Sequence, residues 1–124
     1  MRVVLIVEDN EKNMKLARDI LQAKGFATLE ATSAEQGIRL AQEQIPDLVL
    51  MDIQLGGVNG IKAFELLRAD PRTAAIPVAA FTASVMSNDR NRVTLAGFDA
   101  LLSKPINLKE FVATITRLTS GADS

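Results

Sequence analysis

The stretch LVLMD at residues 48–52 decides the fold, because four consecutive apolar residues end on an acid. A short continuous apolar run is typical of a strand buried on both faces, whereas a half-exposed strand alternates apolar and polar residues. A second such run, Val3–Val7, lies near the start of the chain and is followed by Glu8 and Asp9. Strands of this kind occur in parallel sheets with helices on both faces. The two runs therefore predict an α/β fold.

Amphipathic stretches separate the apolar runs along the whole chain. Three further strands are expected at 27–31, 77–81 and 99–102, with the first of these at the edge of the sheet. Five helices are expected. The first stops at Gly25, and the second runs from a cap at Thr32 or Ser33 to about Gln44. The third covers 61–69, the fourth ends near Leu95, and the fifth begins with a cap at Asn107. Five strand–helix units in strict alternation predict right-handed crossovers and a doubly wound five-stranded parallel sheet.

Composition limits the possible functions. The 124 residues suit one domain, and 48% apolar and 23% charged residues indicate a globular chain. We expect residues 1–119 to form this domain and residues 120–124 a flexible tail. The net charge is −1 and no Lys/Arg-rich run is present, so direct nucleic-acid binding is not expected. No apolar run approaches the roughly 20 residues that span a bilayer, so we expect a cytoplasmic protein.

The chain contains no Cys and no His. Thiolate metal sites, Cys nucleophiles and Ser-His-Asp arrangements are therefore excluded. Any chemistry must use carboxylates, hydroxyls, Lys and a hard metal ion.

Polar residues follow four of the five expected strands. In an open parallel sheet, ligands bind outside the carboxyl ends of the strands. These ends carry Glu8 and Asp9 after the first strand, Asp52 at the third, Thr82 at the fourth and Lys104 at the fifth. Taken singly, the first two acids also fit a helix cap, Thr82 an ordinary strand residue and Lys104 a surface charge. Their convergence on one rim favours a functional site.

Three crowded acids repel one another unless a cation lies among them. Oxygen ligands too few for a full protein cage suit Mg²⁺, which keeps several waters and shares phosphate oxygens. Lys104 can pair with a phosphoryl oxygen and Thr82 can donate a hydrogen bond to one. An ionised Asp52 has no proton to lose, so phosphoryl transfer to it needs no general base. The rim therefore predicts an aspartate that accepts a phosphoryl group.

The segments that carry these residues resemble the receiver family of response regulators over nearly the whole chain. They are Val-Glu-Asp-Asn, Leu-Met-Asp-Ile-Gln-Leu, Thr-Ala and Ser-Lys-Pro, in that order and each at a strand end. Within the family, they look most like single-domain cell-cycle receivers of the DivK kind. The resemblance implies a CheY-like three-layer sandwich with strand order 2-1-3-4-5.

The resemblance also implies a role for each residue. By this resemblance, Asp52 is the phosphoacceptor and a metal ligand. Asp9 would bind Mg²⁺ directly, Glu8 would act through water, and Gln54 would offer its backbone carbonyl. Thr82 and Lys104 would bind the phosphoryl group, and the Lys104–Pro105 bond would be cis. The implied partners are a sensor histidine kinase or histidine phosphotransfer protein and a downstream protein target. No membrane partner is expected, and the chain is expected to be a monomer or weak dimer.

Two positions depart from the family pattern. Gly56 stands where Pro is common after the acceptor, and Leu101 stands where the family carries a switch aromatic three residues before the Lys. Together with Met86, Arg90 and Val93 of the expected fourth helix, Leu101 forms a candidate partner surface. The same helix residues also fit an ordinary half-exposed face.

Three functions compete. The leading hypothesis is a stand-alone response regulator, phosphorylated on Asp52 with Mg²⁺, that acts by protein contact or onward phosphoryl transfer and is not a multi-turnover enzyme. A pseudo-receiver that binds partners without phosphorylation is the alternative, mildly favoured by Leu101 and Gly56. A phosphatase with an aspartyl nucleophile is disfavoured, because such enzymes often carry a second acid where Gln54 stands here.

Overall fold

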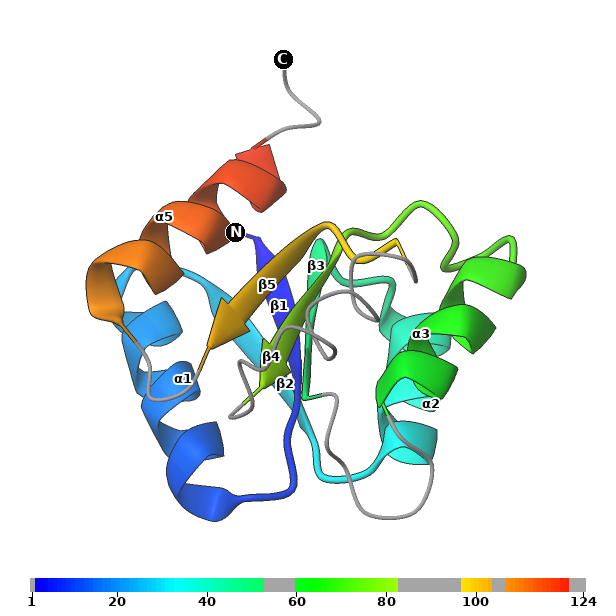
Figure 1. Cartoon of the computed structure of the whole chain (residues 1–124), viewed down its shortest axis with the longest axis horizontal. Coiled ribbons are helices and arrows are strands. Elements are labelled where there is room, and N and C mark those ends of the chain that lie inside the picture. Colours follow the sequence, from blue (N-terminus) through cyan, green and yellow to red (C-terminus); the bar gives the residue numbers. More distant parts are fainter. Residues whose placement is uncertain (1, 53–59, 83–96, 104–106, 121–124) are drawn as a thin grey trace.

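The computed structural model describes residues 2–52, 60–82, 97–103 and 107–120 (Figure 1). Five parallel strands form one sheet in the order β2-β1-β3-β4-β5, which confirms the expected fold. The strands are β1 Val3–Val7, β2 Ala27–Ala31, β3 Leu48–Asp52, β4 Val78–Thr82 and β5 Ala100–Ser103. β4 starts one residue later than expected, after Pro77, which has no N–H to donate to a ladder. β5 also starts one residue later than expected.

Helices cover both faces of the sheet. α1 (Glu11–Ala23) and α5 (Leu108–Ser120) lie on one face, and α2 (Ala34–Gln44) and α3 (Gly60–Ala69) lie on the other (Figure 1). α5 includes Ser120, the first residue of the expected tail. The expected fourth helix falls at residues outside the described part, although Gly97 beyond it is described and has φ +95°. Among the described residues, no helix is long and apolar enough to cross a membrane.

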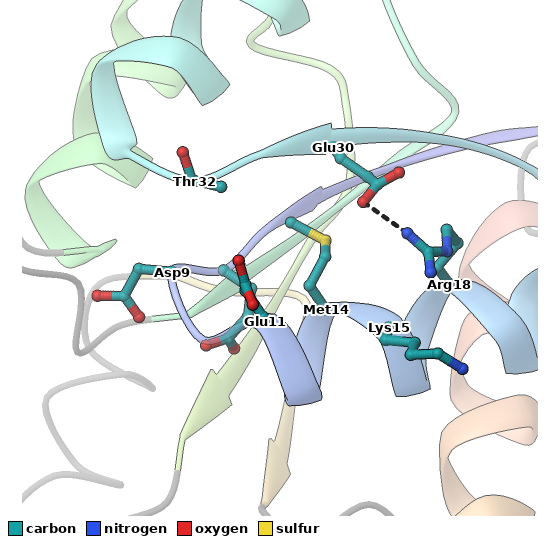
Figure 2. Close-up of a pocket in the computed structure, with 8 residues that line it drawn as sticks. Asp9, Glu11, Met14, Lys15, Arg18, Glu30 and Thr32 are labelled. Carbon is teal, nitrogen blue, oxygen red and sulfur yellow. Dashed lines mark hydrogen bonds and ion pairs between the residues drawn. The ribbon is translucent and has the colours of Figure 1, made fainter.

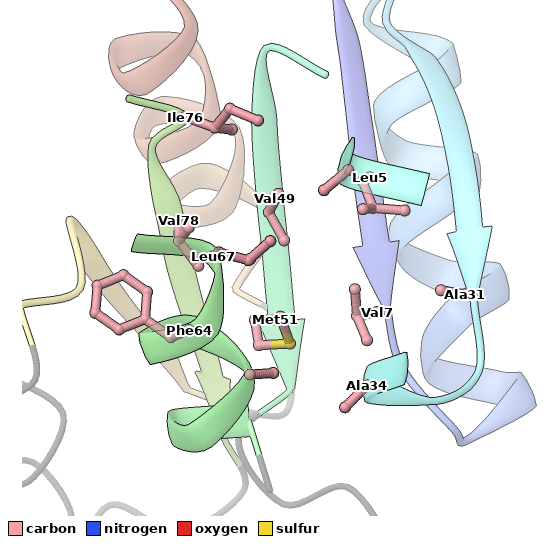
Figure 3. Packing of buried hydrophobic residues seen from close by; sticks show 12 residues of the cluster. Leu5, Val7, Ala31, Ala34, Val49, Met51, Phe64, Leu67, Ile76 and Val78 are labelled. Carbon is pink, nitrogen blue, oxygen red and sulfur yellow. The ribbon is translucent and has the colours of Figure 1, made fainter. Parts of the chain in front are cut away.

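The side chains of β1 explain why the sheet needs two cores. Val4 and Ile6 pack toward α1 and α5, while Leu5 and Val7 pack toward α2 and α3. All four are at most 1% exposed. Figure 3 shows the core on the side of α2 and α3, where Phe64 and Leu67 of α3 lie toward β4. Alternate residues of one continuous apolar run thus serve opposite faces, as a strand geometry of period two requires.

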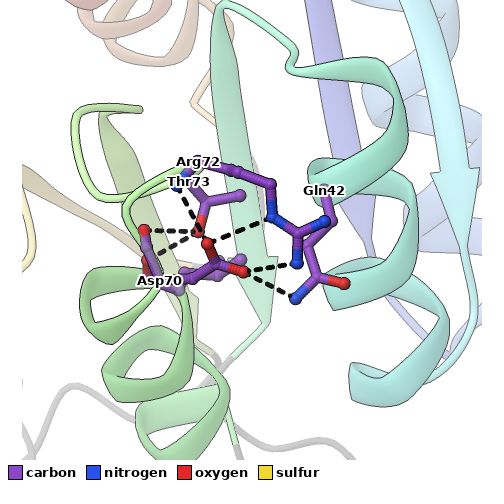
Figure 4. Close-up of polar contacts among 5 residues, drawn as sticks. Gln42, Asp70, Arg72 and Thr73 are labelled. Atoms are coloured by element: carbon purple, nitrogen blue, oxygen red, sulfur yellow. Dashed lines mark hydrogen bonds and ion pairs between the residues drawn. The ribbon is translucent and has the colours of Figure 1, made fainter.

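The end of α3 is held by a side chain rather than by the regular helical ladder. The carbonyl of Leu67 would normally accept from the N–H four residues on, but that residue is Pro71, which has none. The buried Thr73 hydroxyl donates to this carbonyl at 2.6 Å instead, while the Asp70 N–H is 3.4 Å away. Beside it, Asp70 accepts from Arg72 and from Gln42 of α2 (Figure 4). The Arg72 hydrogen bonds lower the pKa of the Asp70 carboxyl.

Thr73→Val should therefore lower the free energy of unfolding by about 1–2 kcal/mol, because the Leu67 carbonyl loses its best donor at constant side-chain shape. Thr119→Val is the matched control. Its hydroxyl donates to the Ile115 carbonyl at 2.9 Å. That carbonyl lies within α5, where the backbone N–H four residues on is its regular donor. Urea unfolding of both variants measures the difference. Equal losses in the two variants would contradict the special role of Thr73.

Candidate functional site

The carboxyl ends of β1 and β3 bring three acids together. The register pairs Val7 with Met51, so the following residues, Glu8 and Asp52, lie at the same edge of neighbouring strands. One carboxylate oxygen from each of Glu8, Asp9 and Asp52 lies within 4.8 Å of the others. The structure therefore places three of the predicted site residues in one cluster.

Burial differs strongly within this cluster. Glu8 is 2% exposed and Asp52 is 3% exposed, whereas Asp9 is exposed. A buried carboxylate is costly unless charge or hydrogen bonds compensate for the lost water. Two such groups side by side favour a cation between them.

The turn from β1 to α1 is built by side-chain hydrogen bonds. Asn10 is the N-cap of α1, and its side-chain oxygen accepts from the backbone N–H groups of Lys12 and Asn13. Its own backbone N–H donates to the Glu8 carboxylate at 3.1 Å. The Glu8 N–H in turn donates to the Ala31 carbonyl of β2 at 2.9 Å. Asn10, rather than Glu8 or Asp9, is therefore the residue that caps this helix, and Asn before a helical run is a recognisable N-cap signal.

A hollow of about 360 Å³ adjoins the acids, between the β1–α1 turn, α1 and β2. Figure 2 shows Asp9 and Glu11 toward one end and the ion pair of Arg18 with Glu30 at the other. The two charged groups of this pair are 3.1 Å apart. Glu8 and Asp9, two of the three clustered acids, thus border a solvent-accessible hollow that is lined mainly by charged residues.

The donor set fits Mg²⁺. All three groups are carboxylates, the hard oxygen ligands that this ion prefers. Three side chains do not complete an octahedral shell, which leaves positions for water and for phosphate oxygens. Glu8 already accepts the Asn10 N–H with one oxygen, which is consistent with a contribution through water rather than direct ligation.

The remaining predicted residues are only partly described. β4 ends at Thr82, whose backbone pairs with Ser103 and follows Phe81, the partner of Asp52. Gln54, Lys104 and Pro105 lie outside the described residues, so the cis bond stays an expectation. Gly56, Met86, Arg90 and Val93 lie outside them too.

Leu101 is described, and it is half-buried. It packs with Ala80 and Phe98 at the β4–β5 side of the sheet. Phe98 stacks on Phe64 of α3 with ring centroids 4.1 Å apart. An aromatic ring is therefore present in this region, three residues before the position where the family pattern has one. Sequence reasoning missed Phe98, because a single Phe next to Gly97 gives no periodic signal.

Comparisons with known proteins agree with this geometry. Residues 4–116 match the family model described as the response regulator receiver domain. The chain is 46% identical over 112 residues to the polar-differentiation response regulators DivK of Brucella ovis and Brucella abortus. The matched region covers 90% of this chain and 91% of each relative.

Solved structures are also similar. The receiver domain of the sensor histidine kinase PA1611 from Pseudomonas aeruginosa has a TM-score of 0.89 at 28% identity, over 96% of this chain and 98% of that one. That structure has a magnesium ion coordinated in its active-site cleft. A CheY-like receiver domain protein from Methanospirillum hungatei has a TM-score of 0.90 at 21% identity, over 99% and 97% of the two chains, and supports the fold.

Proposed function

This chain belongs to the response regulator receiver family, and from that premise we propose that it accepts a phosphoryl group on Asp52 in a Mg²⁺-dependent two-component phosphorelay. The observation that carries the proposal is the cluster of Glu8, Asp9 and Asp52, with carboxylate oxygens within 4.8 Å of one another at the end of the sheet. A buried aspartate at the carboxyl end of a central strand is placed to act as a nucleophile, and its acidic neighbours offer carboxylate oxygens to a cation.

In this proposal, Asp9 and Asp52 hold Mg²⁺ directly, Glu8 contributes through water, and Gln54 contributes its backbone carbonyl. When bound, the ion offsets the charge of the acids and of the phosphoryl oxygens. A carboxylate oxygen of Asp52 attacks the phosphorus of a phosphohistidine, and the P–N bond breaks with its electron pair left on the imidazole. Thr82 and Lys104 then bind oxygens of the new acyl phosphate.

The proposed phosphodonor is a sensor histidine kinase or a histidine phosphotransfer protein. The proposed output is a contact with a downstream protein, or onward phosphoryl transfer, in the cytoplasm. The chain stores one phosphoryl group and is not proposed to turn over substrate. The phosphorylated state biases a conformational equilibrium of the partner surface, since the added charge and the new contacts at Thr82 and Lys104 differ between the two states.

Intact-mass spectrometry after incubation with acetyl phosphate tests the proposal. We expect one phosphoryl group per chain with Mg²⁺ and none when EDTA removes the ion, because the acids otherwise repel the donor. Absence of any mass gain with Mg²⁺ would instead support a pseudo-receiver that binds its partners without phosphorylation.

A further inference from the structure

We propose that Asn10 is a positioning residue for the cation site, because it fixes the turn that presents Asp9 to the metal. The inference rests on the proposed Mg²⁺ site and adds a determinant of its affinity. Asp9 is the exposed member of the acid cluster, so the backbone on either side of it has a large part in setting where its carboxylate lies.

The backbone after Asp9 is held by Asn10. The Asn10 side-chain oxygen accepts from Lys12 N–H at 3.0 Å and from Asn13 N–H at 3.1 Å. The Asn10 carbonyl accepts the Met14 N–H at 2.9 Å, the first regular bond of α1. Asn10 itself is extended, with φ −92° and ψ 120°, so the helical conformation begins only after this residue. These bonds attach the turn to a rigid helix.

The backbone before Asp9 is held by Glu8. This side chain is buried, and its Oε1 accepts the Asn10 N–H at 3.1 Å. The Glu8 N–H is bonded to Ala31 of β2. Asp9 therefore lies between one residue tied to the sheet and one tied to α1, and the Glu8–Asn10 bond closes the turn around it. Groups that orient a metal ligand commonly change metal affinity by tenfold or more when removed.

The inference specifies which substitutions matter. Ala at position 10 removes the acceptor for both N–H groups, whereas Ser can accept from the same helix terminus and is an equally good N-cap. Gly costs the helix only a few tenths of a kcal/mol as an N-cap but frees the backbone at the turn. Asn10→Asp would add a fourth negative charge beside the three acids, so its effect on Mg²⁺ binding would combine charge with positioning.

Isothermal titration of the full chain with MgCl₂ measures the effect. We expect Asn10→Ala to raise the Mg²⁺ dissociation constant about tenfold. Asn10→Gly should also weaken binding despite its near-native stability, and Asn10→Ser should bind nearly as the wild type does. Ser33→Ala is the matched control, because the Ser33 hydroxyl caps α2 by accepting the Gln36 N–H at 3.2 Å. It should lower stability without changing the Mg²⁺ dissociation constant.

Three outcomes separate the possibilities. Wild-type affinity in both Asn10→Ala and Asn10→Gly would overturn the positioning role and leave Asn10 as an ordinary cap. An equal loss of affinity in Ser33→Ala would overturn it too, since the effect would then follow global stability as measured by urea unfolding. Absence of Mg²⁺ binding by the wild type would refute the proposed metal site itself.

Discussion

Asp52→Asn is expected to abolish the phosphoryl mass gain from acetyl phosphate while leaving the fold intact. An amide oxygen is a poor nucleophile compared with an ionised carboxylate, and the proposed reaction has no other group to form the acyl phosphate. Asn has nearly the shape of Asp, so the packing around this 3% exposed side chain is kept. The substitution also removes one of three clustered negative charges, which should maintain or raise stability without metal.

Intact-mass spectra of the wild type and the variant, recorded after the same incubation with Mg²⁺, give the comparison. Asp19→Asn is the matched control, because Asp19 is an exposed acid of α1 that pairs with Lys15 outside the cluster. It should gain the phosphoryl mass as the wild type does. A gain that survives in Asp52→Asn would place the modification on another residue and would disprove the assigned acceptor.

The central strands were predictable because a strand buried on both faces of a parallel sheet has a continuous run of apolar residues, whereas the edge strand gave a weaker signal. Val3–Val7 and Ala27–Ala31 match the expected ranges, and β3 closes on Asp52 as expected. The cap of α2 was left open between Thr32 and Ser33. The structure has Ser33 as the N-cap, because its hydroxyl accepts the Gln36 N–H, and the Gln36 side chain closes the capping box by accepting the Thr32 N–H. Such details depend on backbone direction, which residue types alone do not determine.

The cluster of acids was predictable only in part. That Glu8, Asp9 and Asp52 each lie at the end of a strand is visible in the sequence, but their approach to one another requires β1 and β3 to be neighbours. Strands one and three become neighbours through the reversal of strand order, and the family resemblance supplied that order. The Phe98–Phe64 stack was missed for a similar reason, because the two rings come from different elements and meet only in three dimensions.

Gly37→Ala is expected to lower the free energy of unfolding by about 1–2 kcal/mol, although Ala is the better helix former. Gly37 lies within α2, and a Cβ placed there would be 2.7 Å from Cγ2 and 3.2 Å from Cγ1 of Val7. Val7 is 1% exposed, and a β-branched side chain has few rotamers with which to escape. The helix must therefore move away from β1. Urea unfolding measures the loss, and Arg39→Ala on the exposed side of α2 should change stability by less than about 0.5 kcal/mol.

A double-mutant cycle with Val7→Ala tests the cause. Val7→Ala alone leaves a cavity in the core between the sheet and α2, and Gly37→Ala alone overfills the same space. If the clash is the reason, the double variant should be more stable than the sum of the single losses predicts, by about 1 kcal/mol or more. Additive losses would instead mean that Gly37 matters for a reason other than Val7. Because Val7 directly precedes Glu8, the close approach of Gly37 to β1 lies next to the strand end that carries the acid cluster.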